Sequence, residues 1–185
     1  MKVIQSGDVY NLYGSEVMTY DRLPPKTYTV EFDVHSGCYL KERTNIESNE
    51  KAYGEQTNKV EKVMSAFERI DRSLGIILSG DKGIGKTMFA KRLCERCIEL
   101  GIPVVLVDEG FPRISQFIEK IDQECLVLFD EFEKMFSTCD DEYEDDSEDE
   151  QSKLLSLFDG TSSTKKLCVV TCNNLNCPFI LHNFV

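Results

Sequence analysis

The sequence predicts an α/β fold of three layers, in which helices cover a parallel sheet, together with a small β-rich region at the N-terminus. Four short runs of apolar residues are typical of strands buried on both faces, and segments with helical periodicity separate them. Strands that alternate with helices favour parallel pairing through right-handed crossovers. A chain of 185 residues has room for one such domain and a small appendage.

The β-rich appendage is expected within residues 1–50. Period-two alternation in TYTVEF (27–32), a turn at DVHSG and the run CYLKE (38–42) predict a hairpin. Pro24 and Pro25 exclude a helix from the stretch before it, because proline lacks the N–H group that a helix interior needs. The region has few apolar residues, so its pattern does not establish that it folds alone.

The main domain is expected at residues 58–185, after a polar linker at 51–57. Its first helix is predicted to begin at Asn58, a residue type typical of helix N-caps. The apolar face of this helix comprises Val60, Val63, Met64, Phe67 and Ile70. The predicted strands lie at 75–80, 103–109, 125–131 and 166–173, and the predicted helices at 86–100, about 113–122, and 131–138 with 151–158.

The formal net charge of -12 is concentrated in one segment. Residues 140–150 contain nine acidic residues, so the rest of the chain carries a formal charge of only -3. Such a run repels itself, and we expect a disordered, solvated loop at 139–151. A docking site for a basic partner is the alternative interpretation. The acidic balance disfavours a general nucleic-acid-binding surface, although it leaves room for a local basic patch.

The eight cysteines are expected to be reduced thiols. Cys125 and Cys168 lie within apolar, strand-like runs, where a thiol acts as a small hydrophobic side chain. Cys94 and Cys97 have the spacing of half a zinc site, but no second pair of that spacing follows. Reduced cysteines favour a cytoplasmic protein. The apolar runs are too short to span a bilayer, and the N-terminus lacks the apolar centre of a signal peptide.

A phosphate-binding pattern follows the first predicted strand. Residues 80–87 read Gly-Asp-Lys-Gly-Ile-Gly-Lys-Thr, which is the Walker A pattern GxxxxGK[ST]. Its glycines permit backbone dihedrals that turn N–H groups toward a phosphate, and the start of the next helix adds further donors. Lys86 is predicted to bind the β- and γ-phosphates and Thr87 to bind Mg²⁺. The expected nucleotide contacts are Gly80, Asp81, Lys82, Gly83, Ile84, Gly85, Lys86, Thr87 and Met88.

An acidic pair ends the strand-like run CLVLF at 125–129. Ligands of open parallel sheets gather at the carboxyl ends of the strands, so Asp130 is expected beside Thr87 as a second Mg²⁺ ligand, acting through water. Glu131 is predicted to orient a water for attack on the γ-phosphorus. The pair at 108–109 is a competing candidate, ranked second because its strand is expected at the sheet edge.

From Asn58 to Asn173 the chain resembles the large subdomain of AAA+ ATPases, which are P-loop NTPases. The resemblance rests on the Walker A loop, on FDEFEK (129–134) as the Walker B segment, on the helix SKLLSLFDG (152–160) and on VVTCN (169–173) as the sensor-1 strand. It implies that Asn173, with Asn174 as the fallback, hydrogen-bonds the attacking water or the γ-phosphate. It also implies that the Walker A strand lies between the fourth strand and a fifth.

The end of the chain departs from the family pattern. In the family a fifth strand, an arginine finger and a helical lid follow sensor 1, whereas this sequence ends twelve residues after Asn173 without a further arginine. Only PFIL (178–181) offers a fifth strand. We therefore expect a C-terminally truncated form without the lid, which binds ATP and Mg²⁺ and hydrolyses ATP slowly or not at all.

The resemblance implies an ATPase that remodels a protein partner through its N-terminal region, with a homo-oligomer as the expected assembly. In the loop GFPR (110–113), Phe111 either grips a threaded polypeptide or packs under its own helix. A nucleic-acid-associated loader is an alternative, which the charge balance disfavours. A nucleotide kinase is another, disfavoured because residues 139–164 contain no arginine. A non-catalytic nucleotide-binding protein is the third. No guanine-recognition motif is present, which favours ATP.

Overall fold

The computed structural model of the chain describes residues 1–44, 46, 55–135, 154, 157–158 and 164–173. The strands are β1 (Lys2–Ser6), β2 (Val9–Tyr13), β3 (Thr27–Asp33), β4 (Gly37–Arg43), β5 (Leu74–Ser79), β6 (Val104–Val107), β7 (Cys125–Phe129) and β8 (Lys166–Cys172). The helices are α1 (Glu55–Arg69), α2 (Lys86–Glu99), α3 (Ile114–Glu119) and α4 (Phe132–Met135).

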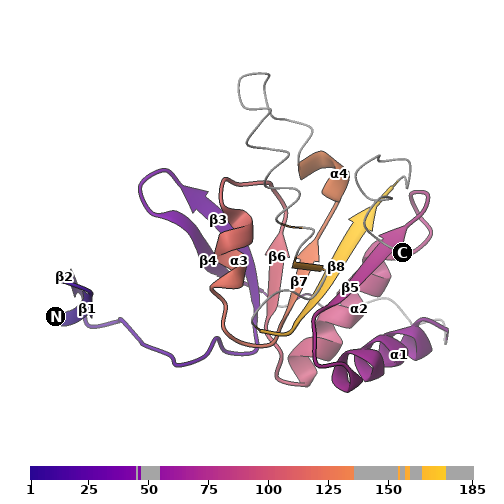
Figure 1. The fold of residues 1–185 in the computed structure, drawn as a ribbon, viewed down its shortest axis with the longest axis horizontal. Helices are drawn as coiled ribbons and strands as arrows, with labels where there is room; N and C mark the ends of the chain where they lie inside the picture. Colours follow the sequence, from indigo (N-terminus) through magenta and orange to yellow (C-terminus); the bar gives the residue numbers. More distant parts are fainter. Residues whose placement is uncertain (45, 47–54, 136–153, 155–156, 159–163, 174–185) are drawn as a thin grey trace.

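Six strands form one sheet in the order β4-β3-β6-β7-β8-β5 (Figure 1). All neighbours in this sheet are parallel except β3 and β4, which are antiparallel. β5 pairs with β8, as expected for the strand that precedes the phosphate-binding pattern. The expectation that β6 lies at the sheet edge is wrong, because β3 pairs with its outer side.

Two apolar clusters, one on each face of the sheet, hold the layers together. Residues of α1 and α2 pack with alternate residues of β6, such as Val104 and Leu106. Residues of α3 and α4 pack on the other face with Val105 and Val107. All four valine and leucine side chains of β6 are nearly inaccessible, and each such side chain contributes about 1.5–3 kcal/mol when buried. The predicted three-layer α/β fold is thus confirmed.

The hairpin predicted at 27–42 forms as β3 and β4, but it is not part of an appendage. β3 is hydrogen-bonded in parallel to β6, from Thr27 opposite Val104 to Thr29 opposite Leu106. Val30 of β3 is only 2% exposed in the core. Local alternation predicts the hairpin correctly but holds no information on which distant strand pairs with it. The limits proposed for the main domain, 58–185, remain a prediction, although its sheet includes β3 and β4.

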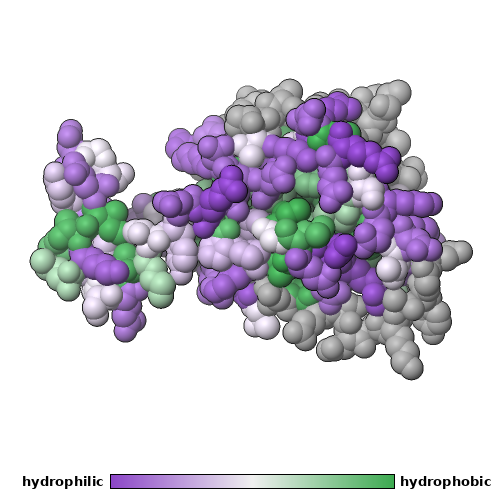
Figure 2. Space-filling model, turned by 90° about the horizontal axis from the view of Figure 1, so that it is seen from below, coloured by the Kyte–Doolittle hydropathy of each residue, from purple (hydrophilic) through white to green (hydrophobic). Residues whose placement is uncertain are grey.

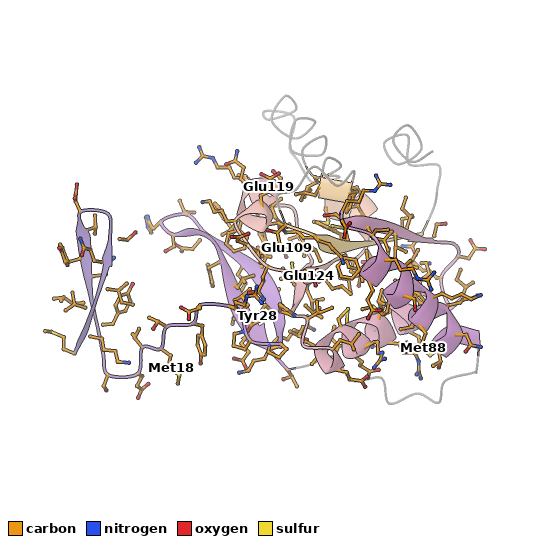
Figure 3. All side chains as sticks on the ribbon, turned by 60° about the horizontal axis from the view of Figure 1, so that its bottom comes forward. Met18, Tyr28, Met88, Glu109, Glu119 and Glu124 are labelled. Carbon is orange, nitrogen blue, oxygen red and sulfur yellow. The ribbon has the colours of Figure 1, made fainter. Side chains whose placement is uncertain are left out.

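β1 and β2 form a separate two-stranded sheet, which stands apart from the main body (Figure 1). Hydrophobic surface is visible on this hairpin at the left of Figure 2. The exposed large apolar side chains of the two strands include Val3, Val9, Tyr10, Leu12 and Tyr13. In Figure 3, Met18 lies on the segment that leads from this hairpin to the body, whereas Tyr28 lies within the large sheet. The expected β-rich N-terminal appendage therefore consists of this small hairpin.

Two of the predicted helices have different bounds in the described part of the structure. α1 begins at Glu55, so the prediction that Asn58 caps it is wrong, and Asn58 lies within the first turn. α4 covers Phe132–Met135 of the helix predicted at 131–138. The acidic loop at 139–151, Asn174 and the candidate fifth strand at 178–181 lie outside the described residues. Within the described residues, the structure contains no helix of the length and apolar character that crossing a membrane requires.

The cysteines within the described residues are free thiols. Burial raises the pKa of Cys97 to about 12 and that of Cys125 to about 11. Burial also raises the pKa of Cys94 and of Cys168. These values keep the thiols protonated at neutral pH, as expected for cysteines that serve as small hydrophobic residues.

Phe111 packs against the hairpin formed by β3 and β4. Its ring stacks on that of Phe32 at a centroid distance of 5.8 Å. Phe111 also packs against the apolar cluster that contains Ile114 and Ile118 of the following helix, α3. A role in gripping a threaded polypeptide stays a prediction.

We expect Val30→Ala to destabilise the whole domain by about 2 kcal/mol, because it leaves a cavity between β3 and the core. The matched variant Val3→Ala in β1, where the side chain is 50% exposed, should change stability by less than about 0.5 kcal/mol. Urea unfolding monitored by circular dichroism measures both effects. If both variants lower the free energy of unfolding by the same small amount, β3 is not part of the core.

Candidate functional site

Three parallel strands bring distant segments of the sequence to one edge of the sheet. Ser79 at the end of β5 is opposite Cys172 of β8, and Phe129 at the end of β7 is opposite Val170 of β8. The loop at 80–87, Asp130 with Glu131, and Asn173 all follow directly from these ends. The polar residues predicted from the sequence therefore converge, as expected for carboxyl ends of parallel strands.

The loop at 80–87 depends on backbone conformations that glycine adopts easily. The φ angles of Gly80, Gly83 and Gly85 are 139°, 89° and 94°. A Cβ atom on Gly80 would lie 2.2 Å from the Cδ1 atom of Ile84, so a side chain there would also collide with the loop. Gly85 in its left-handed conformation precedes the first residue of α2, and the N–H group of Phe89 donates to its carbonyl oxygen over 2.9 Å.

The Lys86 ammonium group folds back over the loop that precedes it. It donates to the carbonyl oxygens of Gly80 and Asp81, the latter over 3.0 Å, and to the Oδ1 atom of Asn173 over 3.3 Å. The predicted phosphate ligand and the predicted sensor residue are therefore in contact, although they are 87 residues apart in the sequence. The oxygens around this ammonium group are hydrogen-bond acceptors, and phosphate oxygens could accept the same hydrogen bonds in their place.

The acidic pair lies at the turn between β7 and α4. Phe129 before the pair and Phe132 after it are both buried, with their rings edge to face at 6.1 Å. Glu131 between them has a positive φ of 49°, which is uncommon for a residue with a side chain. The two phenylalanines thus anchor the turn on both sides, while the side chains of Asp130 and Glu131 stay half-buried at the edge of the sheet.

Thr171 of β8 contacts both acidic residues. Its hydroxyl group donates to the Oδ1 atom of Asp130 over 2.5 Å and accepts a hydrogen bond from the backbone N–H of Glu131 over 2.9 Å. Sequence reasoning missed this residue as part of the site. The available signal was its position two residues before Asn173 on a strand that ends beside the acidic pair.

Thr87 and Asp130 line one cavity of about 600 Å³ between α2 and the sheet. Asp108, the first residue of the competing pair, lines the same cavity and is 3.6 Å from the guanidinium group of Arg43. Glu109 lines a different cavity, beside β3 (Figure 3). The two acidic pairs are therefore not equivalent. Among the described residues, Thr171 links the members of one pair only, by hydrogen bonds to the side chain of Asp130 and the backbone of Glu131.

The remaining predicted contact residues lie on the outside of the loop. Asp81, Lys82 and Gly83 are exposed, as is Ile84 with 60% of its surface accessible. Met88, which is labelled in Figure 3, is half-buried in the first turn of α2. Of these residues, Asp81 contacts the Lys86 ammonium group, through its backbone carbonyl oxygen.

Comparison with known proteins places this chain in a family. Residues 76–181 match the family model described as ATPase family associated with various cellular activities (AAA), which spans more than half of the chain. The chain belongs to the AAA family. No curated protein matches it. Family membership assigns an ATPase-type, nucleotide-binding function to this AAA domain, and the matched range includes the loop, the acidic pair and Asn173.

Two glycines of this AAA domain have similar positive φ angles, and replacing each of them separates an effect on the loop from an effect on stability. Gly85→Ala and Gly101→Ala place a side chain at φ 94° and φ 80°, so each should destabilise the fold by about 1–3 kcal/mol. Gly101 follows the C-terminal end of α2, far from the loop, and a Cβ atom added there would have no other atom within 4 Å. We expect only Gly85→Ala to weaken ATP binding, by about tenfold or more, as measured by calorimetry. Equal affinity in both variants would exclude the loop as the binding site.

Proposed function

We propose that this AAA domain binds ATP with Mg²⁺ in the loop at 80–87 and hydrolyses the nucleotide with a water molecule oriented by Glu131. The observation that supports this proposal most is the contact between Lys86 and Asn173 beside the acidic pair. At one edge of the sheet, the Lys86 ammonium group for phosphate binding and the Asn173 amide for the attacking water thus lie near the carboxylate of Glu131. Such sites act mainly by positioning and charge stabilisation.

Lys86 is proposed to exchange its present acceptors for phosphate oxygens. Its ammonium group is held by two loop carbonyls and the Asn173 amide oxygen, all uncharged acceptors. An ammonium group is attracted more strongly to an anionic phosphate oxygen than to an uncharged carbonyl oxygen, because the two full charges are of opposite sign. Release of the Asn173 amide would then allow it to contact the γ-phosphate or the attacking water.

Thr87 and Asp130 are the residues proposed to hold Mg²⁺. Both line the same cavity, and their hydroxyl and carboxylate oxygens are the hard donors that this ion prefers. The Asp130 Oδ1 atom accepts from Thr171, which leaves the second carboxylate oxygen for the ion or its water. When bound, Mg²⁺ neutralises charge that develops on the phosphate oxygens. Glu131, one residue further, is the group proposed to accept a proton from the attacking water.

The β1–β2 hairpin is proposed to contact the protein partner that the ATPase remodels. Its exposed apolar side chains include Val9 with 60% and Leu12 with 68% of their surface accessible. A two-stranded hairpin alone is marginally stable in water, so contact with another protein would stabilise it. Members of the AAA family often form oligomers, and we propose that this chain assembles with copies of itself.

Replacing the proposed water-orienting residue tests the catalytic assignment. Glu131→Gln keeps the size of the side chain but removes the proton acceptor, so turnover should fall by about 100-fold or more while ATP still binds. The same change at Glu109, which lines the other cavity, should leave turnover unaltered. Phosphate release with and without EDTA measures turnover and its dependence on Mg²⁺. Equal loss in both variants, or none in Glu131→Gln, would contradict the proposal.

A further inference from the structure

Thr171 joins two residues with different proposed roles. Its single hydroxyl group binds the side chain of Asp130 and the backbone of Glu131, at 2.5 Å and 2.9 Å. The side chain is 3% exposed and projects from β8, the strand that lies between β5 and β7. Its contacts therefore cross from one strand to the next, at the point where β7 ends.

The direction of the two hydrogen bonds defines what Thr171 imposes on Asp130. The backbone N–H of Glu131 can only donate, so the hydroxyl accepts there and its one proton is available to Asp130. Asp130 Oδ1 then acts as an acceptor, which fixes the rotation of the carboxylate. The other oxygen is left in a defined direction, which is what a metal ligand needs.

The second bond holds the backbone of Glu131 in its unusual conformation. With φ at 49°, Glu131 lies in the left-handed region, which persists only where surrounding contacts impose it. The N–H group of this residue is the one that donates to Thr171. This backbone conformation sets the direction in which the Glu131 side chain leaves the chain, so the threonine hydroxyl also helps to position that side chain.

Packing alone does not require a hydroxyl at this position. Valine has nearly the same shape as threonine and an equal preference for strands, and the neighbours of Thr171 on β8, Val170 and Cys172, are buried. Two residues further along the chain, Asn173 contacts Lys86. One end of β8 therefore supplies polar contacts to the acidic pair and to the lysine.

We propose that Thr171 is a positioning residue that aligns Asp130 for Mg²⁺ and Glu131 for the attacking water at the same time. This inference rests on the proposed function, because it assigns Thr171 a role in that same site. It makes metal affinity and turnover depend on one buried hydroxyl group that touches neither the nucleotide nor the ion.

The test compares Thr171→Val, which removes the hydroxyl, with Thr171→Ser, which keeps it. Titration of Mg²⁺ at fixed ATP, followed by calorimetry, gives the Mg²⁺ concentration for half-maximal ATP binding, and single-turnover hydrolysis gives the rate. We expect Thr171→Val to raise the Mg²⁺ requirement and to lower the rate, each by about 10–100-fold. Thr171→Ser should stay close to the unmodified protein in both.

Ser73→Ala is the matched control for a loss of stability. Ser73 is 4% exposed, and its hydroxyl group accepts a hydrogen bond from the N–H of Lys166 at the opposite end of β8, over 3.0 Å. This variant also removes a buried hydroxyl that contacts β8, but far from the acidic pair. It should lower the melting temperature without changing the Mg²⁺ requirement.

The outcomes separate this inference from the proposed function. If Thr171→Val matches the unmodified protein, or if Thr171→Ser fails equally, the positioning role is wrong while ATP binding stands. If Ser73→Ala raises the Mg²⁺ requirement as much as Thr171→Val, the effect comes from general weakening of β8, and the positioning role is again wrong. If the unmodified protein shows no Mg²⁺-dependent ATP binding, the proposed function itself fails, and the positioning role with it.

Discussion

The pairing of β8 between β5 and β7 is the constraint on which the rest of the structure depends. β5 carries the loop at 80–87 and β7 carries the acidic pair, but these two strands do not pair with each other. β8 pairs with β5 from Leu74 opposite Leu167 and with β7 from Cys125 opposite Lys166. Because a change of register by one residue would turn every side chain to the other face, this pairing also determines the direction of Thr171.

The free energy gained by apolar burial in the core offsets the cost of unfavourable backbone conformations at the edge of the sheet. Positive φ angles occur at three glycines of the loop and at Glu131, and such a conformation costs about 1–3 kcal/mol in a residue with a side chain. The strands below are almost completely buried, with every residue of β7 and β8 inaccessible. Glu131 thus carries strain beside the proposed ligand-binding groups, and apolar burial of the strands beneath it offsets that cost.

Local patterns were sufficient to predict the fold class and most of the site. Uniformly apolar runs predicted β5, β6, β7 and β8, and the spacing of Gly80, Lys86 and Thr87 predicted the loop between a strand and a helix. Non-local features were not predictable in this way. The pairing of β3 with β6 depends on a contact between segments about 75 residues apart, and the role of Thr171 depends on which strand lies beside β7. The start of α1 at Glu55, three residues before the predicted cap Asn58, was not predicted either.

The central claim is that the loop and the acidic pair act as one site for ATP with Mg²⁺. Calorimetric titration of ATP into the unmodified protein and into Lys86→Ala, each with and without Mg²⁺, tests it most directly. We expect one ATP-binding site per chain. Mg²⁺ should strengthen binding there, and Lys86→Ala should weaken it by at least about tenfold. Binding that is indifferent both to Mg²⁺ and to the loss of the Lys86 ammonium group would contradict it.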